Sequence, residues 1–316
     1  MAINKAMKMA LKAISYPDMK NVYKMQRAIQ NVKSPILKPL YDRLDPIISC
    51  NGREVPVRLY TPPRIESPLL MLFFHGGGWV TESVDTYDSV CRCLARQMRC
   101  RVISVEYGLA PENPFPNGLE DCYAVAKELF MRPECFDVRP ENIVLIGDSA
   151  GGNLAAAVSL MARDQGEFQV HTQILLYPAT HNDHSNSSKF PSIVTNGKDY
   201  LLTSKRVREY MELYAGKRED FQNPYFAPLL AKDFSHQPRT LVITAEYDPL
   251  RDEGEAYGEA LRAAGNTVAI YRMKDALHGF FSLDYHFVHV KRAYQVMKDF
   301  LDWEVKHDLE SRTGMD

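Results

Sequence analysis

The sequence predicts an α/β fold built on a mostly parallel sheet, and two features of its apolar pattern lead to that prediction. From about residue 69 onward, short apolar runs alternate with longer segments of helical spacing. Several of the short runs are wholly apolar, as expected for parallel strands that are covered on both faces. A strand followed by a helix, repeated along the chain, favours a sheet with helices on both sides.

The strands and helices are assigned in chain order. A half-buried edge strand is expected at 55–60, where Val55, Val57 and Leu59 alternate with other residues. Further strands are expected at 69–74, 102–105, 143–146, 174–177, 241–245 and 267–271, and helices at 119–130, 153–163, 253–264 and 288–303. A chain of this length accommodates one such domain with additional segments.

Two segments stand outside the alternation. Residues 1–48 are expected to form a helical cap, and residues 49–316 the main α/β domain, with a cap insertion at about 180–237. The cap prediction depends on two apolar stripes at helical spacing, Met7, Leu11 and Ile14 followed by Met25, Ile29 and Val32. In the insertion, 181–188 is expected to be a loop and Ser204 to cap a helix. Both segments are expected to cover the carboxyl ends of the strands.

Composition argues against several classes of function. The net charge is −2 and the sequence pI about 6.5, so neither nucleic acid nor an anionic membrane is an expected partner. No stretch approaches the roughly 18 apolar residues of a spanning helix, and Lys5, Lys8 and Lys12 interrupt any secretory signal. The six cysteines form no Cys-x-x-Cys pair, so we expect reduced thiols in a cytoplasmic protein and no metal site.

The strongest catalytic signal follows the apolar strand at 143–146 and precedes a helix: Gly147-Asp148-Ser149-Ala150-Gly151. A nucleophile on a sharp strand-to-helix turn projects its hydroxyl from a strained backbone. Small residues on both sides are needed because the turn brings the strand and helix backbones together. The alternative is a glycine-rich turn whose serine merely caps the helix. The strand before and the helix after favour Ser149 as a nucleophile.

A second motif directly follows the strand at 69–74: His75-Gly76-Gly77-Gly78-Trp79. Three glycines let the backbone turn its amides toward a substrate oxygen. We expect the amides of Gly76, Gly77 and Ala150 to form a three-donor oxyanion hole. A phosphate cradle is the competing interpretation, but the motif lacks the Lys-Ser/Thr ending and the Gly-x-Gly-x-x-Gly spacing. His75 is expected to anchor the loop and Trp79 to form a wall.

A nucleophilic serine needs a base, and the base needs an acid that fixes its tautomer. His278 is the expected base because it follows the last strand, where a loop would return to the carboxyl edge of the sheet. Four other histidines lie in polar stretches and are expected at the surface: His171, His181, His184 and His236. Asp248 is the expected acid because it lies just past the strand at 241–245. Its rival Asp252, with Glu253, is interpreted as a helix N-terminal cap.

The chain order Ser149, Asp248, His278 is that of α/β-hydrolases and not of chymotrypsin-like or subtilisin-like proteases. With these residues in place, the chain resembles the hormone-sensitive-lipase family of α/β-hydrolases over about residues 70–305. Further matching motifs are Asp248-Pro249-Leu250-Arg251-Asp252-Glu253-Gly254, His278-Gly279-Phe280 and Tyr107-Gly108-Leu109-Ala110-Pro111-Glu112. Gly108 is a departure, since the family usually has arginine there, and the change is expected to remove a structural ion pair.

The resemblance implies the α/β-hydrolase fold with an N-terminal helical cap, and a carboxylesterase that prefers short acyl chains. It implies a small-molecule ester as the partner, with no cofactor and no metal. Dimers are common in such families, which leaves a homodimer open. Two alternatives also stay open: a peptidase or amidase on the same fold, and a non-catalytic ligand receptor. The plant gibberellin receptors that resemble this family have lost the histidine, whereas this chain retains His278.

Overall fold

The computed structural model describes residues 23–28 and 46–313, with side chains up to residue 301. The strands are β1 Ile47–Cys50, β2 Arg53–Tyr60, β3 Leu70–Phe74, β4 Arg101–Val105, β5 Ile143–Asp148, β6 Thr172–Leu176, β7 Arg239–Tyr247 and β8 Val268–Leu277. The longer helices are α3 Asp88–Met98, α4 Asn117–Met131, α5 Ala150–Gln165, α7 Ser204–Tyr214, α8 Arg251–Ala263 and α9 Val288–Thr313. The short ones are α6 Pro191–Thr195 and the 3-10 turns η1 Pro133–Phe136, η2 Pro140–Asn142, η3 Arg218–Gln222, η4 Pro228–Leu230 and η5 Phe280–Ser282.

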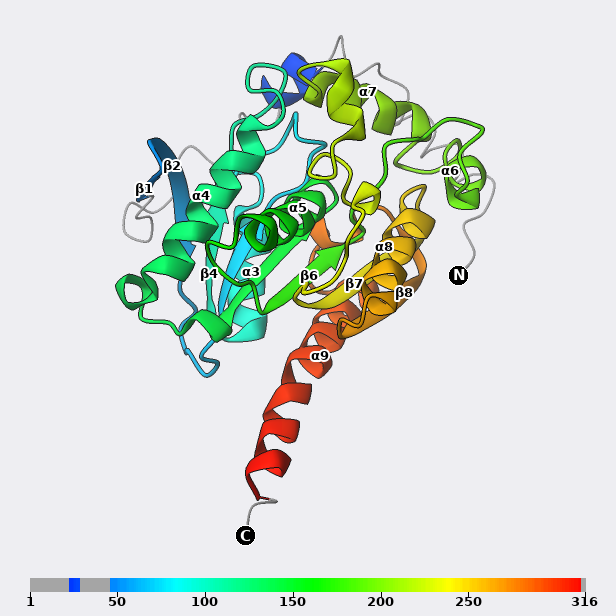
Figure 1. The fold of residues 1–316 in the computed structure, drawn as a ribbon. Helices are drawn as coiled ribbons and strands as arrows, with labels where there is room; N and C mark the ends of the chain where they lie inside the picture. Colours follow the sequence, from blue (N-terminus) through cyan, green and yellow to red (C-terminus); the bar gives the residue numbers. More distant parts are fainter. Residues whose placement is uncertain (1–22, 29–45, 314–316) are drawn as a thin grey trace.

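These strands form one eight-stranded sheet in the order β1-β2-β4-β3-β5-β6-β7-β8 (Figure 1). Pairing is parallel from β4 through β8 and antiparallel where β2 meets β1 and β4. The predicted α/β fold with a mostly parallel sheet is therefore confirmed. Because the strands from β4 to β8 run the same way, their carboxyl ends meet at one edge of the sheet.

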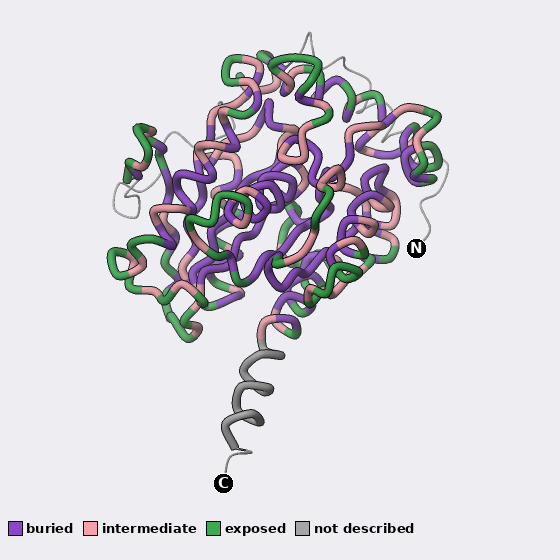
Figure 2. Tube along the Cα trace, in the orientation of Figure 1, coloured by how far each residue is buried: buried purple, intermediate pink, exposed green. Residues whose placement is uncertain are grey.

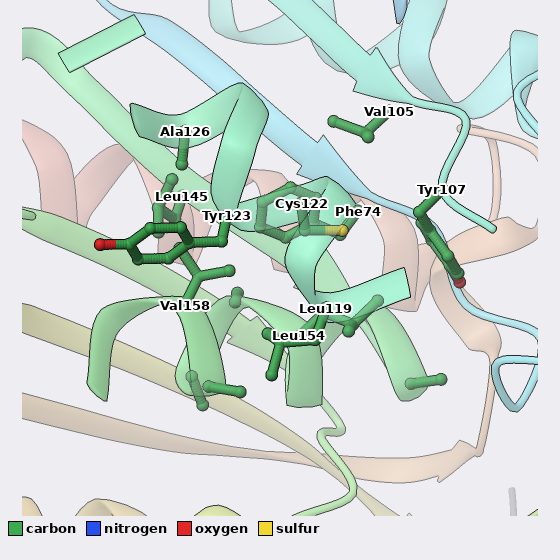
Figure 3. Packing of buried hydrophobic residues seen from close by; sticks show 14 of the residues in the cluster. Phe74, Val105, Tyr107, Leu119, Cys122, Tyr123, Ala126, Leu145, Leu154 and Val158 are labelled. Atoms are coloured by element: carbon green, nitrogen blue, oxygen red, sulfur yellow. The ribbon is translucent and has the colours of Figure 1, made fainter. Parts of the chain in front are cut away.

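Successive side chains of the central strands enter two different hydrophobic cores. In β3, Leu70, Leu72 and Phe74 pack in the core beneath α4, α5 and α8, whereas Met71 and Phe73 pack in the core beneath α3 and α9. Figure 3 shows part of the first core, where α4 and α5 side chains meet the sheet. Buried residues accordingly follow the strands and the inner faces of the helices (Figure 2). Burial on both faces explains why these strands read as continuous apolar runs.

β2 is not the edge strand that the alternation predicted. β1 pairs with its outer side and β4 with its inner side. The turn between β1 and β2 is Asn51-Gly52, with φ of 53° and 76°, the conformation that a two-residue hairpin turn requires. The sheet therefore begins at Ile47, inside the segment assigned to the cap.

The chain between β6 and β7 interrupts the alternation of strands and helices. Its helices α6 and α7 lie beyond one end of the sheet (Figure 1). The helix cap differs from the prediction: the Thr203 side chain accepts a hydrogen bond from the Arg206 amide, while Ser204 is the first helical residue. The Ser204 hydroxyl donates instead to the carbonyl of Ile193. The residue before the predicted cap is thus the one that caps α7.

Within the predicted N-terminal cap, the structure describes residues 46–48, where the sheet begins, and residues 23–28, which form a short helix near α7 (Figure 1). Tyr23 is buried in the first core, while Met25 is 59% exposed and so does not belong to a buried apolar stripe. The other residues named for the two stripes lie outside the described residues. In the part of the chain that is described, no helix is long and apolar enough to cross a membrane.

Candidate active site

Ser149 occupies a strained turn between β5 and α5. Its φ of 54° and ψ of −115° lie outside the regions that L-residues favour, at a cost of about 1–3 kcal/mol. Two hydrogen bonds to the neighbouring strand segment hold this conformation: the Ser149 amide donates to the Leu176 carbonyl at 2.8 Å, and the Ser149 carbonyl accepts from the Ala179 amide at 3.3 Å. A Cβ at Gly151 would lie 1.9 Å from the Phe74 carbonyl oxygen, so only glycine permits this close approach.

The side chains of Ser149, His278 and Asp248 form one continuous hydrogen-bonded chain. Nε2 of His278 lies 2.9 Å from Oγ of Ser149, and Nδ1 of His278 lies 2.7 Å from Oδ2 of Asp248. The Asp248 side chain is fully buried and that of His278 is 12% exposed. Ser149 follows β5, Asp248 follows β7 and His278 follows β8, so the sheet edge brings them together. In this arrangement the imidazole can accept the serine proton while the carboxylate stabilises its charged form.

The loop that carries Asp248 is held from two sides. Oδ1 of Asp248 accepts from the Leu250 amide at 2.9 Å, and the Asn196 side chain donates to the Asp248 carbonyl at 3.2 Å. The rival acid Asp252 accepts from the Ser192 amide at 2.7 Å and from the Arg251 side chain at 2.8 Å. Asp252 therefore binds the chain between β6 and β7 through Ser192, whereas the Asp248 carboxylate faces the imidazole of His278.

Glu253 is fully buried and does not cap α8, which corrects the prediction for the acidic pair. Its Oε1 accepts from the amides of Thr180 at 2.8 Å and His181 at 3.1 Å, and its Oε2 lies 2.7 Å from Nε2 of His184. His181 and His184 are buried as well, so the prediction that they lie at the surface is wrong. Glu253 and His181 satisfy backbone amides where the insertion begins, since Nδ1 of His181 accepts from the Asp183 amide at 3.1 Å, and His184 faces the Glu253 carboxylate.

His75 holds the glycine loop, which we define as residues 75–79. Its buried ring stacks on Tyr107 at 4.3 Å, and its Nδ1 lies 2.8 Å from the Gly76 carbonyl. The Tyr107 hydroxyl donates to the His75 carbonyl at 2.7 Å. Burial lowers the pKa of His75 to about 4, so the ring is neutral near pH 7. These contacts agree with the anchoring role expected of His75.

The glycine loop turns through three successive residues of positive φ. The values are 107° at Gly77, 62° at Gly78 and 59° at Trp79. Helix α7 packs against this turn: the Trp79 ring stacks on Tyr214 at 4.6 Å, and a Cβ at Gly78 would lie 2.4 Å from the Tyr210 ring. A non-glycine residue keeps such a conformation only where its surroundings fix it. The insertion therefore supports the shape of the loop directly.

A cavity of about 230 Å³ opens beside Ser149 and His278. The glycine loop contributes Gly77 and Gly78 to its lining, and α5 contributes Ala150. Gly76 does not line it: a Cβ there would lie 2.9 Å from the Asp148 carboxylate, whose charged form the Gly76 amide stabilises. Of the residues predicted for the oxyanion hole, Gly77 and Ala150 line the cavity and Gly76 does not, while Gly78, which was not among them, does. The triple glycine contained this residue, but the pattern did not distinguish among its members.

Asp148, next to Ser149, is a buried carboxylate for which the sequence predicted no role. The Tyr87 hydroxyl donates to its Oδ2 at 2.9 Å and the Tyr177 hydroxyl at 3.3 Å. Burial raises the pKa of Asp148 to about 6, although these hydroxyls and the nearby His278 oppose the rise. The Tyr177 ring also packs edge-on against His278 at 4.9 Å. Through Tyr177, Asp148 therefore connects the turn at Ser149 to the residues that pack against His278.

Asp121, the acidic residue that contacts Gly108, is paired although this chain has glycine at position 108. The Gly108 amide donates to Oδ2 of Asp121 at 2.9 Å, and the Arg53 guanidinium donates to Oδ1 of Asp121 at 2.7 Å. Arg53 comes from β2, a different element from the loop that carries Gly108. An arginine from the sheet therefore pairs with Asp121, and the loss of an ion pair at Gly108 stays a prediction from the family resemblance.

A nucleophile turn, a histidine and an acid at the carboxyl edge of a parallel sheet define an α/β-hydrolase arrangement. A family profile described as alpha/beta hydrolase fold matches residues 71–282. The chain belongs to this family, which confirms the resemblance to the hormone-sensitive-lipase group.

Three similar proteins illustrate the relationship. An arylesterase of Saccharolobus solfataricus is 34% identical over 82% of this chain and 85% of its own length. An ethyl acetate hydrolase of Pseudomonas putida is 33% identical over 73% of this chain and 72% of its own length. The solved structure of a hyperthermophilic esterase from Pyrobaculum calidifontis superposes with a TM-score of 0.82 at 35% identity, covering 96% of this chain and all of that chain (100%).

The raised pKa of Asp148 predicts how Asp148→Asn changes the pH dependence of stability. Ionising the buried carboxyl costs the folded protein about 3 kcal/mol, since the folded pKa is about 6 against 3.8 when unperturbed. This cost is absent below pH 4, where the group is protonated in both states, and complete above pH 6. The asparagine variant should therefore gain about 3 kcal/mol relative to the parent between pH 4 and pH 8, measured by urea unfolding. A difference that does not change with pH would contradict this prediction.

Proposed function

We propose that the protein is a serine-dependent carboxylesterase that hydrolyses short-chain acyl esters through an acyl-enzyme intermediate. The observation that carries the proposal is the continuous path from the Ser149 hydroxyl through His278 to Asp248, which opens on a cavity lined by residues of the glycine loop and by Ala150. The related arylesterase and ethyl acetate hydrolase support carboxylic esters as the substrate class. The hydrogen-bonded His278 argues against a non-catalytic receptor.

In the first half-reaction, Oγ of Ser149 attacks the ester carbonyl carbon while Nε2 of His278 takes the hydroxyl proton. The buried Asp248 carboxylate stabilises the imidazolium that results. The tetrahedral intermediate then collapses, the bond to the alcohol oxygen breaks, and His278 gives its proton to the departing alcohol. The acyl group remains bound to Ser149.

In the second half-reaction, water attacks the acyl carbonyl carbon while His278 takes a proton from the water. Collapse of this intermediate breaks the bond to Oγ, which regains its proton from His278 as the carboxylic acid leaves. Both half-reactions use the same base because the imidazole returns to its neutral form at the end of each.

The negative oxygen of both intermediates needs hydrogen-bond donors, and we assign them to Gly77, Gly78 and Ala150. All three residues line the cavity beside Ser149. Ala150 is the first residue of α5, where amides have no acceptor inside the helix and the helix dipole favours negative charge. The two glycines lie in the positive-φ turn that α7 supports. A preorganised set of this kind stabilises the transition state without reorganisation.

The size of the cavity favours short acyl chains. Its volume of about 230 Å³ is below the range of about 300–1,000 Å³ that is typical of sites for drug-sized ligands. Leu201, Leu202, Val207 and Leu250 give it an apolar wall. An acyl chain of a few carbons is the group that such a wall and volume accommodate.

The cellular setting and the assembly of the enzyme are further proposals. All six cysteines are free thiols, as expected in the reducing cytoplasm. A homodimer stays a prediction from the family resemblance, and sedimentation of the purified protein would test it.

Ser149→Ala should abolish hydrolysis of p-nitrophenyl butyrate, because within residues 23–28 and 46–301 the Ser149 hydroxyl is the one that lies within hydrogen-bond distance of His278. We expect kcat to fall by ~10⁴-fold or more, as for other serine nucleophiles. The control is Ser282→Ala, which removes another hydroxyl that lines the cavity and should keep the rate of the parent within about threefold. A Ser149→Ala variant that retains most of its rate would refute the assignment.

Matched esters and amides assayed with the parent distinguish an esterase from an amidase.

Gly78→Ala should lower kcat by about 10²–10³-fold, because the added methyl group meets the Tyr210 ring and displaces an oxyanion donor. Gly166→Ala is the matched control. Gly166 has a similar φ of 66°, but a Cβ there meets nothing within 4 Å. The control variant therefore carries the backbone strain alone, and its kcat should be that of the parent at a temperature where both are folded. Equal kcat values in the two variants would remove Gly78 from the proposed oxyanion hole.

A series of p-nitrophenyl esters should show the highest kcat/KM with acyl chains of about two to six carbons, since longer chains exceed the cavity. Steady-state kinetics across the series from acetate to laurate checks this expectation. A maximum at laurate would overturn the preference for short chains and leave the catalytic residues untouched.

A further inference from the structure

Residues 23–28 contribute one side chain to the active-site cavity, although they are far from the catalytic residues in sequence. Gln26 lines the cavity together with Ser149 and His278. Gln26 thus brings an amide side chain to a lining to which the insertion contributes Leu201 and Leu202 together with Arg206. An alkyl chain that reaches this amide displaces its water without offering a hydrogen bond in return, which is unfavourable.

The neighbouring Arg27 fixes this short helix to the rest of the protein. Its Nε donates to the Val80 carbonyl at 2.6 Å and its Nη2 donates to the Ala110 carbonyl at 2.6 Å. Its Nη1 donates to Oε2 of Glu112 at 3.0 Å. A single guanidinium thus donates hydrogen bonds to three acceptors. Its planar set of donors allows this arrangement, and a lysine ammonium does not reproduce it.

The two carbonyls that Arg27 contacts belong to the surroundings of the glycine loop. Val80 directly follows Trp79, and its amide donates to the Gly77 carbonyl at 3.2 Å. The Ala110 amide donates to the Trp79 carbonyl at 2.9 Å. Charge-assisted hydrogen bonds to backbone carbonyls are among the stronger polar contacts in proteins. The position of Gln26 is therefore tied to the part of the fold that carries the proposed oxyanion donors.

We propose that Arg27 is a positioning residue that holds residues 23–28 against the glycine loop, and that Gln26, so held, restricts the length of the alkyl chain that the cavity accepts. The inference rests on the proposed esterase function and adds its specificity determinant. Arg27 acts through Gln26 and touches neither the ester nor the catalytic residues.

Two variants and one matched control test this proposal. Gln26→Leu keeps a side chain of similar size and removes the amide. Arg27→Met removes the guanidinium, and Lys24→Met removes one positive charge from an exposed position of the same short helix. Each is assayed with p-nitrophenyl esters of increasing acyl length and with alkyl acetates of increasing alcohol length, at a temperature where circular dichroism shows the fold retained.

In Gln26→Leu and Arg27→Met, kcat/KM for eight-carbon relative to four-carbon chains should rise by about fivefold or more in one of the two ester series. Lys24→Met should keep the ratio of the parent. Hydrogen exchange provides a second readout: backbone amides at 23–28 should lose protection in Arg27→Met and keep it in Lys24→Met, because short helices persist only through tertiary contacts.

An unchanged chain-length ratio in both ester series, for either variant, would overturn the proposal, as would full protection of 23–28 in Arg27→Met. A parent enzyme that hydrolyses no ester would instead refute the proposed function. Hydrogen exchange would then still decide whether Arg27 holds the segment.

Discussion

The candidate site depends on the parallel sheet, which brings three chain segments to a common edge. Ser149 and His278 are 129 residues apart in sequence, yet their side chains are 2.9 Å apart because β5 and β8 end on the same side. Asp248 follows β7, which pairs with β8 and so places the acid beside the base. Burial of the central strands on both faces stabilises this frame, and the chemistry is confined to the loops that leave it.

Strained backbone at this edge is held by elements from elsewhere in the chain. The unfavourable φ of Ser149 is fixed by hydrogen bonds to the last residue of β6 and to Ala179 beyond it, and the positive-φ turn through Trp79 is fixed by Tyr214 of α7. Strain of this kind is stable only where packing over-determines it. The insertion and the short helix that contains Arg27 therefore serve two purposes, since they form the cavity wall and also maintain the shape of the loop that faces the nucleophile.

Much of this arrangement was predictable because the decisive signals are local. Wholly apolar runs identify the central strands, and Ser149 stands directly after one of them. Asp248 stands directly after β7, and His278 follows the edge strand β8, whose side chains are mostly half-buried or exposed. The short β1 escaped prediction, although Asn51-Gly52 is a hairpin turn signal that could have revealed it. The choice among the three glycines, the burial of Glu253 with its two histidines, and the pairing of Arg53 with Asp121 depend on contacts between distant segments. Sequence periodicity carries no information about such contacts.

The central claim is that the sheet edge makes one serine hydroxyl nucleophilic through one histidine. Labelling with a fluorophosphonate, followed by peptide mass spectrometry, tests it most directly. The account predicts a single adduct per chain, on Ser149, and labelling that slows by about 10²-fold or more in His278→Ala. An adduct on another residue, or a His278→Ala variant that is labelled as fast as the parent, would contradict it.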